Sequence, residues 1–422
     1  MGLGKIGLPL AAQYASKGFF VIGCDISPSV VEAVNWGGSP VENEPGLPEI
    51  VAENVLAGRL WATTDIIWAA TESDVVVVIV PLLIDENRCP DFKSIDQATL
   101  AVGRGLHRDQ LVIYETTLPV GTTRYHFGEM LYEVSGLTPG RDFWLAFSPE
   151  RVYSGRIFTD LQRYPKIVGG IDSASTARAV NFYRQALDAE VMAVENAELA
   201  EFTKLIETTY RDVNIALANE FAQHAAELGI DVTVAIRAAN TQPYSHIHAP
   251  GVGVGGHCIP VYPYFLLNGY NGHESSSLRL PRLARHVNDS MAGYAVELLV
   301  NALSGLADRR VLILGLAYRE NVKETAFSPA KGLITALKSK GAEVFLNDPL
   351  FSPDEIEAHG VHSVDINKTL PVDAVILQSY HDAYKTLDMS RFEGCKIILD
   401  GCNALDRAAI EHHGLQYLGI GR

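Results

Sequence analysis

The first part of the chain alternates short apolar runs with stretches of helical periodicity. Six runs before residue 195 are rich in apolar residues: FFVIGCDI, DVVVVIVP, LVIYETT, FWLAFSPE, KIVGG and EVMAV. Continuous runs of this kind are typical of strands that are buried on both faces of a parallel sheet. The pattern therefore predicts a doubly wound α/β domain over residues 1–194.

Helical periodicity dominates the middle of the chain. Apolar residues recur every three or four positions from Leu199 to Phe221, which predicts one long helix that ends at Gly229. The same periodicity resumes after Leu278. We therefore expect residues 195–304 to form a helical middle domain that joins two others.

The last third of the chain begins a second α/β unit. RRVLILGLAYRE is typical of a strand entering a glycine turn, SPAKGLITALKSKG of a helix, and AEVFLNDP of a strand that ends at Asp348. This order of strand, helix, strand and acid repeats that of the first domain. The fold class is therefore α/β, with a second Rossmann-like, doubly wound parallel sheet predicted over residues 305–422.

A glycine loop opens the chain, because Gly2, Gly4 and Gly7 form the pattern G-x-G-x-x-G. In dinucleotide-binding domains these glycines permit a tight turn, close approach of the backbone to pyrophosphate, and packing of helix on strand. Asp25 ends the next strand, where a carboxylate binds the adenosine ribose and repels a 2'-phosphate. We expect NAD as the cofactor; the alternative is a glycine-rich turn with a solvated Asp25.

No strand precedes this loop, since only Met1 comes before Gly2. The absence would leave neighbouring strands of the sheet without hydrogen-bond partners. We expect the natural chain to begin upstream, with about half a dozen residues that form a short strand. Without them, we expect weaker binding of the cofactor.

Composition narrows the functional classes. The 422 residues exceed what one hydrophobic core accommodates. The net charge of -16 argues against nucleic acid or an anionic membrane as a partner. No apolar run reaches bilayer-spanning length and no signal segment is evident, so we expect a cytoplasmic location. The five cysteines lack any C-x-x-C, which favours reduced thiols over a disulfide framework or a zinc ribbon.

The segment HAPGVGVGGHCIPVYPYF places four glycines just before Cys258. Glycines let backbone amides approach a ligand, and a thiol beside them is a candidate nucleophile. A buried inert cysteine is the commoner role. A zinc site formed by His246, His248, His257 and Cys258 is a further alternative, although the intervening glycines suit a substrate loop better.

Lys204 lies in the long helical pattern, and Thr208 follows one turn later on the same face. A lysine on a helix is usually solvated. Among apolar neighbours its ammonium needs a charged or polar partner, and a developing alkoxide is one such partner.

Seven segments occur in the order found in the nucleotide-sugar 6-dehydrogenases: GLGKIGLPLA, VPLLIDENRCPDF, YETTLPVGTT, FSPERVYSG, AELAEFTKLIETTYRDVNIALANE, GVGVGGHCIP and GLAYRENVKETAFSPA. The chain resembles the UDP-glucose and UDP-N-acetylmannosamine dehydrogenase family over nearly its whole length. The resemblance implies a four-electron oxidation, in which two NAD+ convert the C6 alcohol of a nucleotide diphosphate sugar to a carboxylate. It also implies that a cysteine traps the intermediate aldehyde as a thiohemiacetal, which becomes a thioester and is hydrolysed.

The resemblance implies catalytic roles for five residues. Cys258 matches the family nucleophile, and Lys204 matches the lysine that stabilises oxygen charge. Glu150 matches the carboxylate that assists attack of water on the thioester, and Thr117 a threonine beside water and the cofactor. Thr208 stands where the family usually has asparagine, so we expect a weaker or water-mediated contact with the oxyanion.

The resemblance also implies the binding residues, and it implies no metal. Those expected to bind NAD are Gly2, Gly4, Lys5, Ile6, Gly7, Asp25, Pro81, Thr117 and Glu150. Those expected to bind substrate are Glu150, Arg151, Val152, Lys204, Thr208, His248, Gly251, Gly255, Gly256, Tyr318 and Arg319. Tyr318 and Arg319 occupy the places of an aromatic residue and a lysine that hold the diphosphate, and Arg319 supplies the positive charge that an acidic chain needs there.

Other departures from the family pattern bear on activation and substrate. Tyr262 replaces an aspartate near the thiol, and a phenol is a neutral hydrogen-bond donor. Ser154 replaces a second glutamate of the UDP-glucose branch, which favours an N-acetylated sugar. Ala326 and Cys402 replace two arginines, so a thymidine diphosphate sugar is an alternative to a uridine one.

Two other functional classes are alternatives. One is a two-electron dehydrogenase of the 6-phosphogluconate or hydroxyacyl type, which has no need for Cys258. The other is an NAD-binding protein without catalysis, which the replacements Thr208 and Tyr262 favour. The family also implies a homodimer that is built on the central helices.

Overall fold

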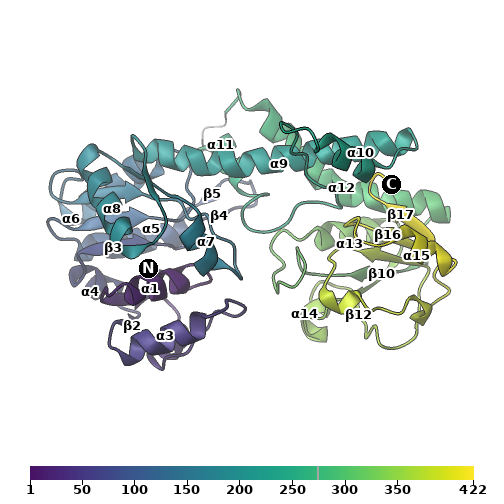
Figure 1. Ribbon diagram of the computed structural model, residues 1–422, viewed down its shortest axis with the longest axis horizontal. Coiled ribbons are helices and arrows are strands. Elements are labelled where there is room, and N and C mark those ends of the chain that lie inside the picture. Colours follow the sequence, from purple (N-terminus) through teal and green to yellow (C-terminus); the bar gives the residue numbers. More distant parts are fainter. Residues whose placement is uncertain (273–274) are drawn as a thin grey trace. The chain divides into compact units, whose positions relative to one another are not determined.

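The computed structural model describes residues 1–272 and 275–422. The chain divides into two compact units, each with its own sheet (Figure 1). The first unit contains Met1–Glu207 and Tyr264–Ser275, and the second contains Thr208–Pro263 and Ser276–Arg422.

The first unit is built on a five-stranded sheet of order β3-β6-β7-β8-β9. Its strands are β3 (Val75–Val78), β6 (Leu111–Tyr114), β7 (Trp144–Phe147), β8 (Lys166–Gly170) and β9 (Val191–Ala193). Strands β3, β6 and β7 are parallel, but β8 runs antiparallel to β7. The prediction of a wholly parallel sheet was therefore wrong here, because an apolar run reports burial on both faces and not the direction of the strand.

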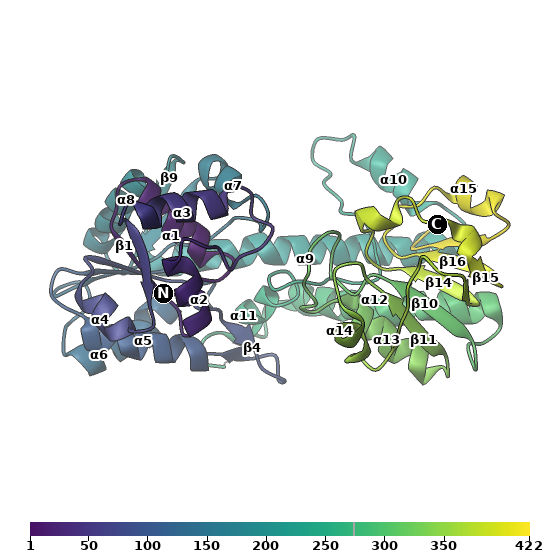
Figure 2. The ribbon, with the colours of Figure 1, turned by 90° about the horizontal axis from the view of Figure 1, so that it is seen from below.

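Helices cover both faces of this sheet, as Figure 2 shows. On one face α1 (Gly7–Ser16) and α8 (Ser173–Ala186) pack against β6, β7 and β8 in a shared apolar core. On the other face lie α5 (Lys93–Gly105) and α6 (Gly128–Ser135). This layering is the doubly wound arrangement that the sequence predicted.

A second, two-stranded parallel sheet joins β1 (Val21–Cys24) and β2 (Leu60–Thr63). The backbone of Met1 and Gly2 lies between β1 and β3: Met1 exchanges hydrogen bonds with Val77 and Ile79, and the amide of Gly2 donates to Cys24 at 2.7 Å. Strand β2 was not predicted, because four residues of alternating burial are too short a signal. The first unit also contains α2 (Pro28–Asn35), α3 (Leu47–Leu56), α4 (Ile66–Thr71), β4 (Leu83–Ile84), β5 (Pro90–Asp91), the π-helix η1 (Thr122–Phe127) and α7 (Ile157–Arg163).

The long helix is confirmed as α9 (Ala197–Glu227), which begins in the first unit and ends in the second. It is followed by α10 (Val232–Ala239), α11 (Tyr262–Asn268) and α12 (Arg279–Leu303). Within residues 1–272 and 275–422, no helix has both the length and the apolar character needed to cross a membrane.

A six-stranded, fully parallel sheet forms the centre of the second unit, in the order β12-β11-β10-β14-β16-β17. Its strands are β10 (Arg310–Leu314), β11 (Glu343–Asn347), β12 (His362–Ser363), β14 (Ala374–Leu377), β16 (Ile397–Asp400) and β17 (Gln416–Gly419). Counted along the chain this order is third, second, first, fourth, fifth, sixth, which is the order of dinucleotide-binding sheets. The second Rossmann-like unit is thus present.

Alternate residues of β10 serve two different cores. Val311 and Ile313 pack with α12 and α13 (Pro329–Ser339), whereas Leu312 and Leu314 pack on the other face. Burial on both faces explains the continuous apolar run of this strand. The remaining elements are α14 (Pro353–Glu357), β13 (Leu370–Pro371), the 3-10 helices η2 (Asp382–Tyr384) and η3 (Met389–Arg391), β15 (Phe392–Glu393) and α15 (Arg407–His412).

A buried carboxylate joins α9 to the loop after β6. Glu201 accepts hydrogen bonds from the amides of Gly121 and Thr123 at 2.6 and 2.9 Å, and from the Thr123 hydroxyl at 2.6 Å. Burial raises the pKa of Glu201 to about 8 although these hydrogen bonds oppose the shift. The contact fixes the start of η1.

Replacing Glu201 by Gln should destabilise the protein by about 2 kcal/mol, because the amide leaves buried donors without an acceptor. Chemical denaturation would measure the loss. A folded-state pKa above the ordinary 4.5 means that the contribution of Glu201 is full at low pH and falls as the pH rises toward 8. The difference in free energy of unfolding between the parent and Glu201→Gln should therefore become smaller as the pH rises toward 8.

Glu198→Gln is the matched control, since Glu198 lies one turn earlier on α9 in a partly exposed ion pair with Arg124. It should cost less than about 1 kcal/mol. Equal losses for the two substitutions would contradict the role of Glu201.

Candidate active site

The glycine loop has the backbone that a pyrophosphate site requires. Gly2 has a φ of +92°, and a Cβ on Gly7 would lie 1.8 Å from the carbonyl oxygen of Gly2. No side chain fits at Gly7, whereas Gly4 faces open space. Because α1 begins at Gly7, the amides of its first turn point toward this space.

The surroundings of the loop fit a dinucleotide. One carboxylate oxygen of Asp25 accepts from the amide of Leu3 at 2.9 Å, and Asp25 stays half-buried at the end of β1. Lys5 and Pro81 are exposed and Ile6 is half-buried, as expected for residues that border the cofactor. The glycine loop would therefore bind the pyrophosphate of NAD, and Asp25 would accept hydrogen bonds from its adenosine ribose.

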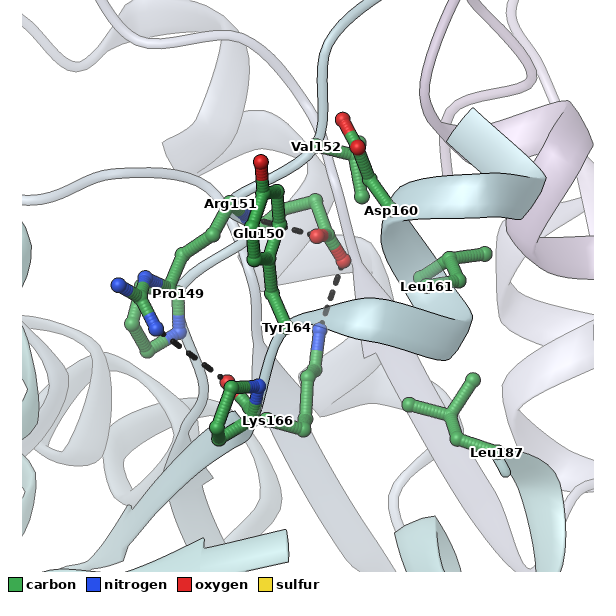
Figure 3. Close-up of a pocket in the computed structure, with 10 residues that line it drawn as sticks. Pro149, Glu150, Arg151, Val152, Asp160, Leu161, Tyr164, Lys166 and Leu187 are labelled. Atoms are coloured by element: carbon green, nitrogen blue, oxygen red, sulfur yellow. Dashed lines mark hydrogen bonds and ion pairs between the residues drawn. The ribbon is translucent and has the colours of Figure 1, made fainter. Parts of the chain in front are cut away.

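Glu150 belongs to a cluster of buried charges, and its contact with Lys166 is drawn in Figure 3. The Lys166 ammonium donates to Glu150 at 2.8 Å and to Glu115 at 2.9 Å. The hydroxyls of Tyr14 and Tyr183 donate to the other oxygen of Glu115 at 3.0 and 2.5 Å. One cation thus serves two carboxylates in the interior of the first unit.

The partners set the ionisation of each member of this cluster. Burial opposes the charge of Lys166, but the two carboxylates outweigh it and raise the pKa. Burial also opposes the charge of Glu150, but the charge and hydrogen bond of Lys166, the amide of Arg151 and the charge of Lys204 together outweigh it and lower the pKa. For Glu115 burial prevails, and the pKa is raised. Glu150 is therefore the acid of the cluster that holds a negative charge most readily.

The sequence analysis missed Glu115 and Lys166. Glu115 directly follows β6 and Lys166 is the first residue of β8, so each is a charged residue at the end of an apolar run. A buried charge needs a partner of opposite sign. That signal was available in YETT and PKIVGG, but the sequence does not say that the two runs are brought together.

Arg151 and Val152 extend this part of the site. Arg151 donates to Glu207 at 2.8 Å. It also donates to the carbonyl of Pro165 at 3.4 Å, the contact drawn from Arg151 in Figure 3. A small pocket beside Glu150 is lined by Pro149, Glu150, Arg151, Val152, Asp160, Leu161, Tyr164, Pro165, Lys166 and Leu187.

Thr117 and Lys204 are the remaining predicted residues of the first unit. Both are buried, and the charge of Lys204 contributes to the lowered pKa of Glu150. Thr208, one turn further along α9, is also buried and belongs to the second unit. Lys204 is therefore a buried cation whose charge acts on Glu150, and its role toward the substrate oxygen stays a prediction.

Cys258 is exposed at the end of its glycine loop, and its Sγ lies 3.7 Å from the hydroxyl of Tyr262. A Cβ on Gly255 would lie 2.6 Å from the Cβ of Tyr318, and one on Gly256 would lie 2.9 Å from the Tyr318 ring. Glycine at both positions is what lets Tyr318 pack against the loop. The structure thus brings the predicted thiol and the predicted diphosphate-binding segment together within the second unit.

A chain of buried polar groups supports this loop. The amide of Gly251 donates to Asn219 at 3.0 Å, Asn219 donates to Asn288 at 2.9 Å, and Asn288 donates to Asp212 at 2.8 Å. Arg285 completes the chain with an ion pair to Asp212 at 2.5 Å. Apart from Gly251, sequence reasoning identified none of these residues, because their contacts join three distant segments.

The histidines near Cys258 have other contacts. The backbone amide of His248 donates to Asn214 at 3.0 Å, and burial together with Arg211 lowers the pKa of its ring. His257 forms an ion pair with Glu324. Among the residues that the structure describes, no three His, Cys, Asp or Glu side chains are placed to hold a metal ion.

The segment that carries Tyr318 and Arg319 is held by Asp348. This carboxylate follows β11, as Asp25 follows β1. One of its oxygens accepts from the amides of Leu316 and Ala317 at 2.7 and 2.9 Å. The same oxygen lies 3.1 Å from Nε2 of His381. The acid at the strand end is thus occupied by the protein itself.

His381 links this acid to the far end of the segment. Its Nδ1 accepts from the amide of Asn321 at 2.9 Å, so the ring proton resides on Nε2 and points to Asp348. The ring is buried. Its two contacts hold the segment at both ends.

Comparison with known proteins identifies the domains. Residues 1–187 match the NAD binding domain of the UDP-glucose/GDP-mannose dehydrogenase family, residues 198–290 its central domain, and residues 312–407 its UDP binding domain. The chain belongs to the UDP-glucose/GDP-mannose dehydrogenase family. The resemblance predicted from the seven segments is confirmed.

Individual relatives are similar along the full chain. A UDP-N-acetyl-D-mannosamine dehydrogenase of Pyrococcus horikoshii is 35% identical over an alignment of 431 positions, which covers 100% of this chain and 98% of that protein. A solved UDP-D-ManNAc dehydrogenase structure from the same organism has a TM-score of 0.90 at 35% identity, with 100% and 98% of the two chains covered. An NDP-N-acetyl-D-galactosaminuronic acid dehydrogenase structure from Methanosarcina mazei has a TM-score of 0.87 at 31% identity, with 100% and 94% covered.

Family membership makes the chain an NAD-dependent nucleotide-sugar dehydrogenase. The predicted cofactor, NAD, is confirmed. The domain bounds at residues 194 and 304, the roles of the site residues and the homodimer stay predictions.

Replacing His381 by Leu should weaken binding of UDP about 10-fold, because the loss of two hydrogen bonds frees the segment that carries Tyr318 and Arg319. Calorimetric titration with UDP would measure the change, and NAD affinity should not alter.

His362→Leu is the matched control, since His362 is an exposed histidine of β12 in the same sheet. It should leave UDP binding unchanged. A folded His381→Leu protein that binds UDP as tightly as the parent would contradict this role.

Proposed function

We propose that the protein oxidises the C6 hydroxyl of UDP-N-acetylmannosamine to a carboxylate, with two NAD+ consumed per sugar. The exposed thiol of Cys258, at the end of a glycine loop against which Tyr318 packs, carries this proposal. A reaction that stops at the aldehyde has no need for a nucleophile, whereas oxidation to the acid does.

The sugar is proposed from two independent observations. The relatives described above are named for N-acetylated sugars. Ser154 stands where the UDP-glucose branch has a second glutamate. Uridine is proposed as the base because the last domain matches a UDP binding domain, and a thymidine diphosphate sugar is the alternative that Ala326 and Cys402 favour.

The first oxidation requires stabilisation of negative charge on the C6 oxygen. We assign this role to the ammonium of Lys204, with a hydrogen bond from the Thr208 hydroxyl. NAD, held by the glycine loop and Asp25, would supply the hydride acceptor for both oxidations. The buried position of Lys204 favours the role, because a charge excluded from water acts more strongly on a nearby oxyanion.

The second oxidation and the release of product use the thiol and the carboxylate. Cys258 attacks the aldehyde carbon to form a thiohemiacetal, which loses a second hydride and becomes a thioester. Glu150, held as a carboxylate by Lys166, then accepts a proton from the water that attacks the thioester. Thr117, close in the chain to Glu115, would orient this water.

Substrate binding follows from charge and shape. Arg319 supplies positive charge for the diphosphate, and Tyr318 packs against Gly255 and Gly256. Arg151, Val152, His248 and Gly251 are the remaining residues that we assign to substrate.

A panel of UDP-N-acetylmannosamine, UDP-N-acetylglucosamine, UDP-glucose and dTDP-glucose, followed by NADH absorbance, tests the assignment. We expect the first to react fastest and to yield two NADH per sugar. One NADH per sugar would favour the two-electron dehydrogenase, and no NADH with intact NAD binding would favour a protein without catalysis.

Cys258→Ser should lower formation of the sugar acid at least about 1,000-fold, since a hydroxyl is a far weaker nucleophile here. Cys395→Ser is the matched control, a half-buried cysteine of the same unit, and it should leave formation of the acid unchanged. Full conversion to the acid by Cys258→Ser would contradict the thioester route.

A homodimer built on α9 is the second part of the proposal. The helix exposes large apolar side chains at a spacing of three, four or seven residues, which places them on one face. They are Leu199, Phe202, Ile206, Tyr210, Leu217 and Phe221, each at least 41% exposed. Such a stripe is typical of a surface that another copy covers.

Phe202→Glu combined with Leu217→Glu should convert a dimer to a monomer, because two buried charges would face their own copies across a two-fold axis. Light scattering at micromolar concentration would measure the mass. Lys331→Glu, an exposed change on α13, should leave the mass unchanged. A monomeric parent protein would contradict the dimer.

A further inference from the structure

The buried cluster around Lys166 contains one more carboxylate than a simple ion pair. The side chains of Lys166, Glu115 and Glu150 are 4%, 0% and 12% exposed. One ammonium faces two carboxylates, so the cluster carries an excess negative charge when both acids are ionised. Such an excess is costly in the interior, and uptake of one proton removes it.

We propose that Lys166 and Glu115 form a buried ion-pair cluster with Glu150 that lets Glu150 take up a proton during hydrolysis of the thioester. The inference rests on the proposed function, because it assigns the environment of the same carboxylate. Lys166 and Glu115 are positioning residues, since they act through Glu150 and not on the substrate.

Lys166 keeps Glu150 ionised before the proton arrives. Its ammonium donates to Oε2 of that carboxylate at 2.8 Å. Without it, burial and the charge of Glu115 would favour the protonated acid, which cannot accept a proton.

Glu115 keeps Lys166 paired after the proton arrives. Once Glu150 is neutral, the ammonium retains its contact with Glu115 at 2.9 Å. Hydrogen bonds from Tyr14 and Tyr183 support the charge of Glu115 in that state. No buried charge is left without a partner at any stage of the transfer.

The groups that face Glu150 come from several elements of the first unit. Lys204 of α9 contributes positive charge. The amide of Arg151 donates to the second carboxylate oxygen at 2.6 Å, and the Arg151 side chain is paired with Glu207. On α7, Asp160 lines the same pocket and is paired with Arg156; Tyr164, directly after α7, lines it too.

The hydrolytic step balances in atoms and electrons. The oxygen of water forms a bond to the C6 carbonyl carbon, and the bond from C6 to Sγ of Cys258 breaks with its electron pair on sulfur. One proton of the water passes to Glu150, and the other is lost to solvent when the carboxylic acid ionises. No oxidant or reductant is required.

The experiment compares Lys166→Met, Lys166→Arg and Glu115→Gln in the complete protein. The readouts are the pH profile of steady-state turnover, the rate of the first hydride transfer in a single turnover, and the intact mass of acid-quenched enzyme. The mass reports any acyl group that stays on Cys258.

Lys166→Met should slow steady-state turnover at pH 7 roughly 100-fold, the range of a general base. Its acid limb should move to higher pH, and the acyl adduct should accumulate while the first hydride transfer keeps its rate. Glu115→Gln should move the acid limb to lower pH, because it removes the competing negative charge. Lys166→Arg should stay close to the parent.

An unshifted acid limb in both Lys166→Met and Glu115→Gln would overturn this role of the cluster. Equal slowing of the first hydride transfer and of hydrolysis in Lys166→Met would also overturn it. If Lys166→Met does not fold, the direction of the shift in Glu115→Gln decides the question. Failure of the proposed function is separate, because it would appear as full formation of the acid by the Cys258→Ser variant, in which Lys166 and Glu115 are intact.

Discussion

Buried carboxylates hold the loops of both units, and each must be fully provided with donors because an unpaired charge in the interior is prohibitively costly. Glu201 accepts three hydrogen bonds, one from Gly121 just before η1 and two from Thr123 at the start of η1. Asp348 accepts two amides and a histidine. Glu115 shares Lys166 with Glu150. In each case a segment that carries proposed site residues is fixed by a buried carboxyl group whose hydrogen-bond partners the fold itself supplies.

An aspartate follows the corresponding strand in each Rossmann-like unit, but the two aspartates have different roles. Asp25 follows β1 in the first unit and stays half-buried, so a ribose can reach it. Asp25 and Asp348 both accept from an amide of their own glycine turn, but Asp348, which follows β11 in the second unit, is buried and also contacts His381. The second unit therefore keeps the strand order of a dinucleotide-binding domain but directs its acid inward, toward the segment of Tyr318 and Arg319.

Glycines and buried polar side chains have different roles in the loop that carries Cys258. Gly255 and Gly256 admit the ring of Tyr318, where any side chain would collide with it. The loop is fixed at Gly251 by a hydrogen bond to Asn219, which begins the chain of buried polar groups that leads to Arg285. Shape is thus set by the absence of side chains and position by buried hydrogen bonds, which leaves Cys258 exposed for chemistry.

Local patterns determined most of the fold and many of the candidate site residues, because periodicity, glycine turns and strand-end acids act within a few neighbouring residues. From these came the helix α9, the glycine loop, Asp25 and the loop of Cys258. Only the tertiary structure decided the antiparallel direction of β8, the pairing of Lys166 with Glu115, and the inward use of Asp348. These depend on which distant segments meet, and the cost of an unpaired buried charge is decided only there.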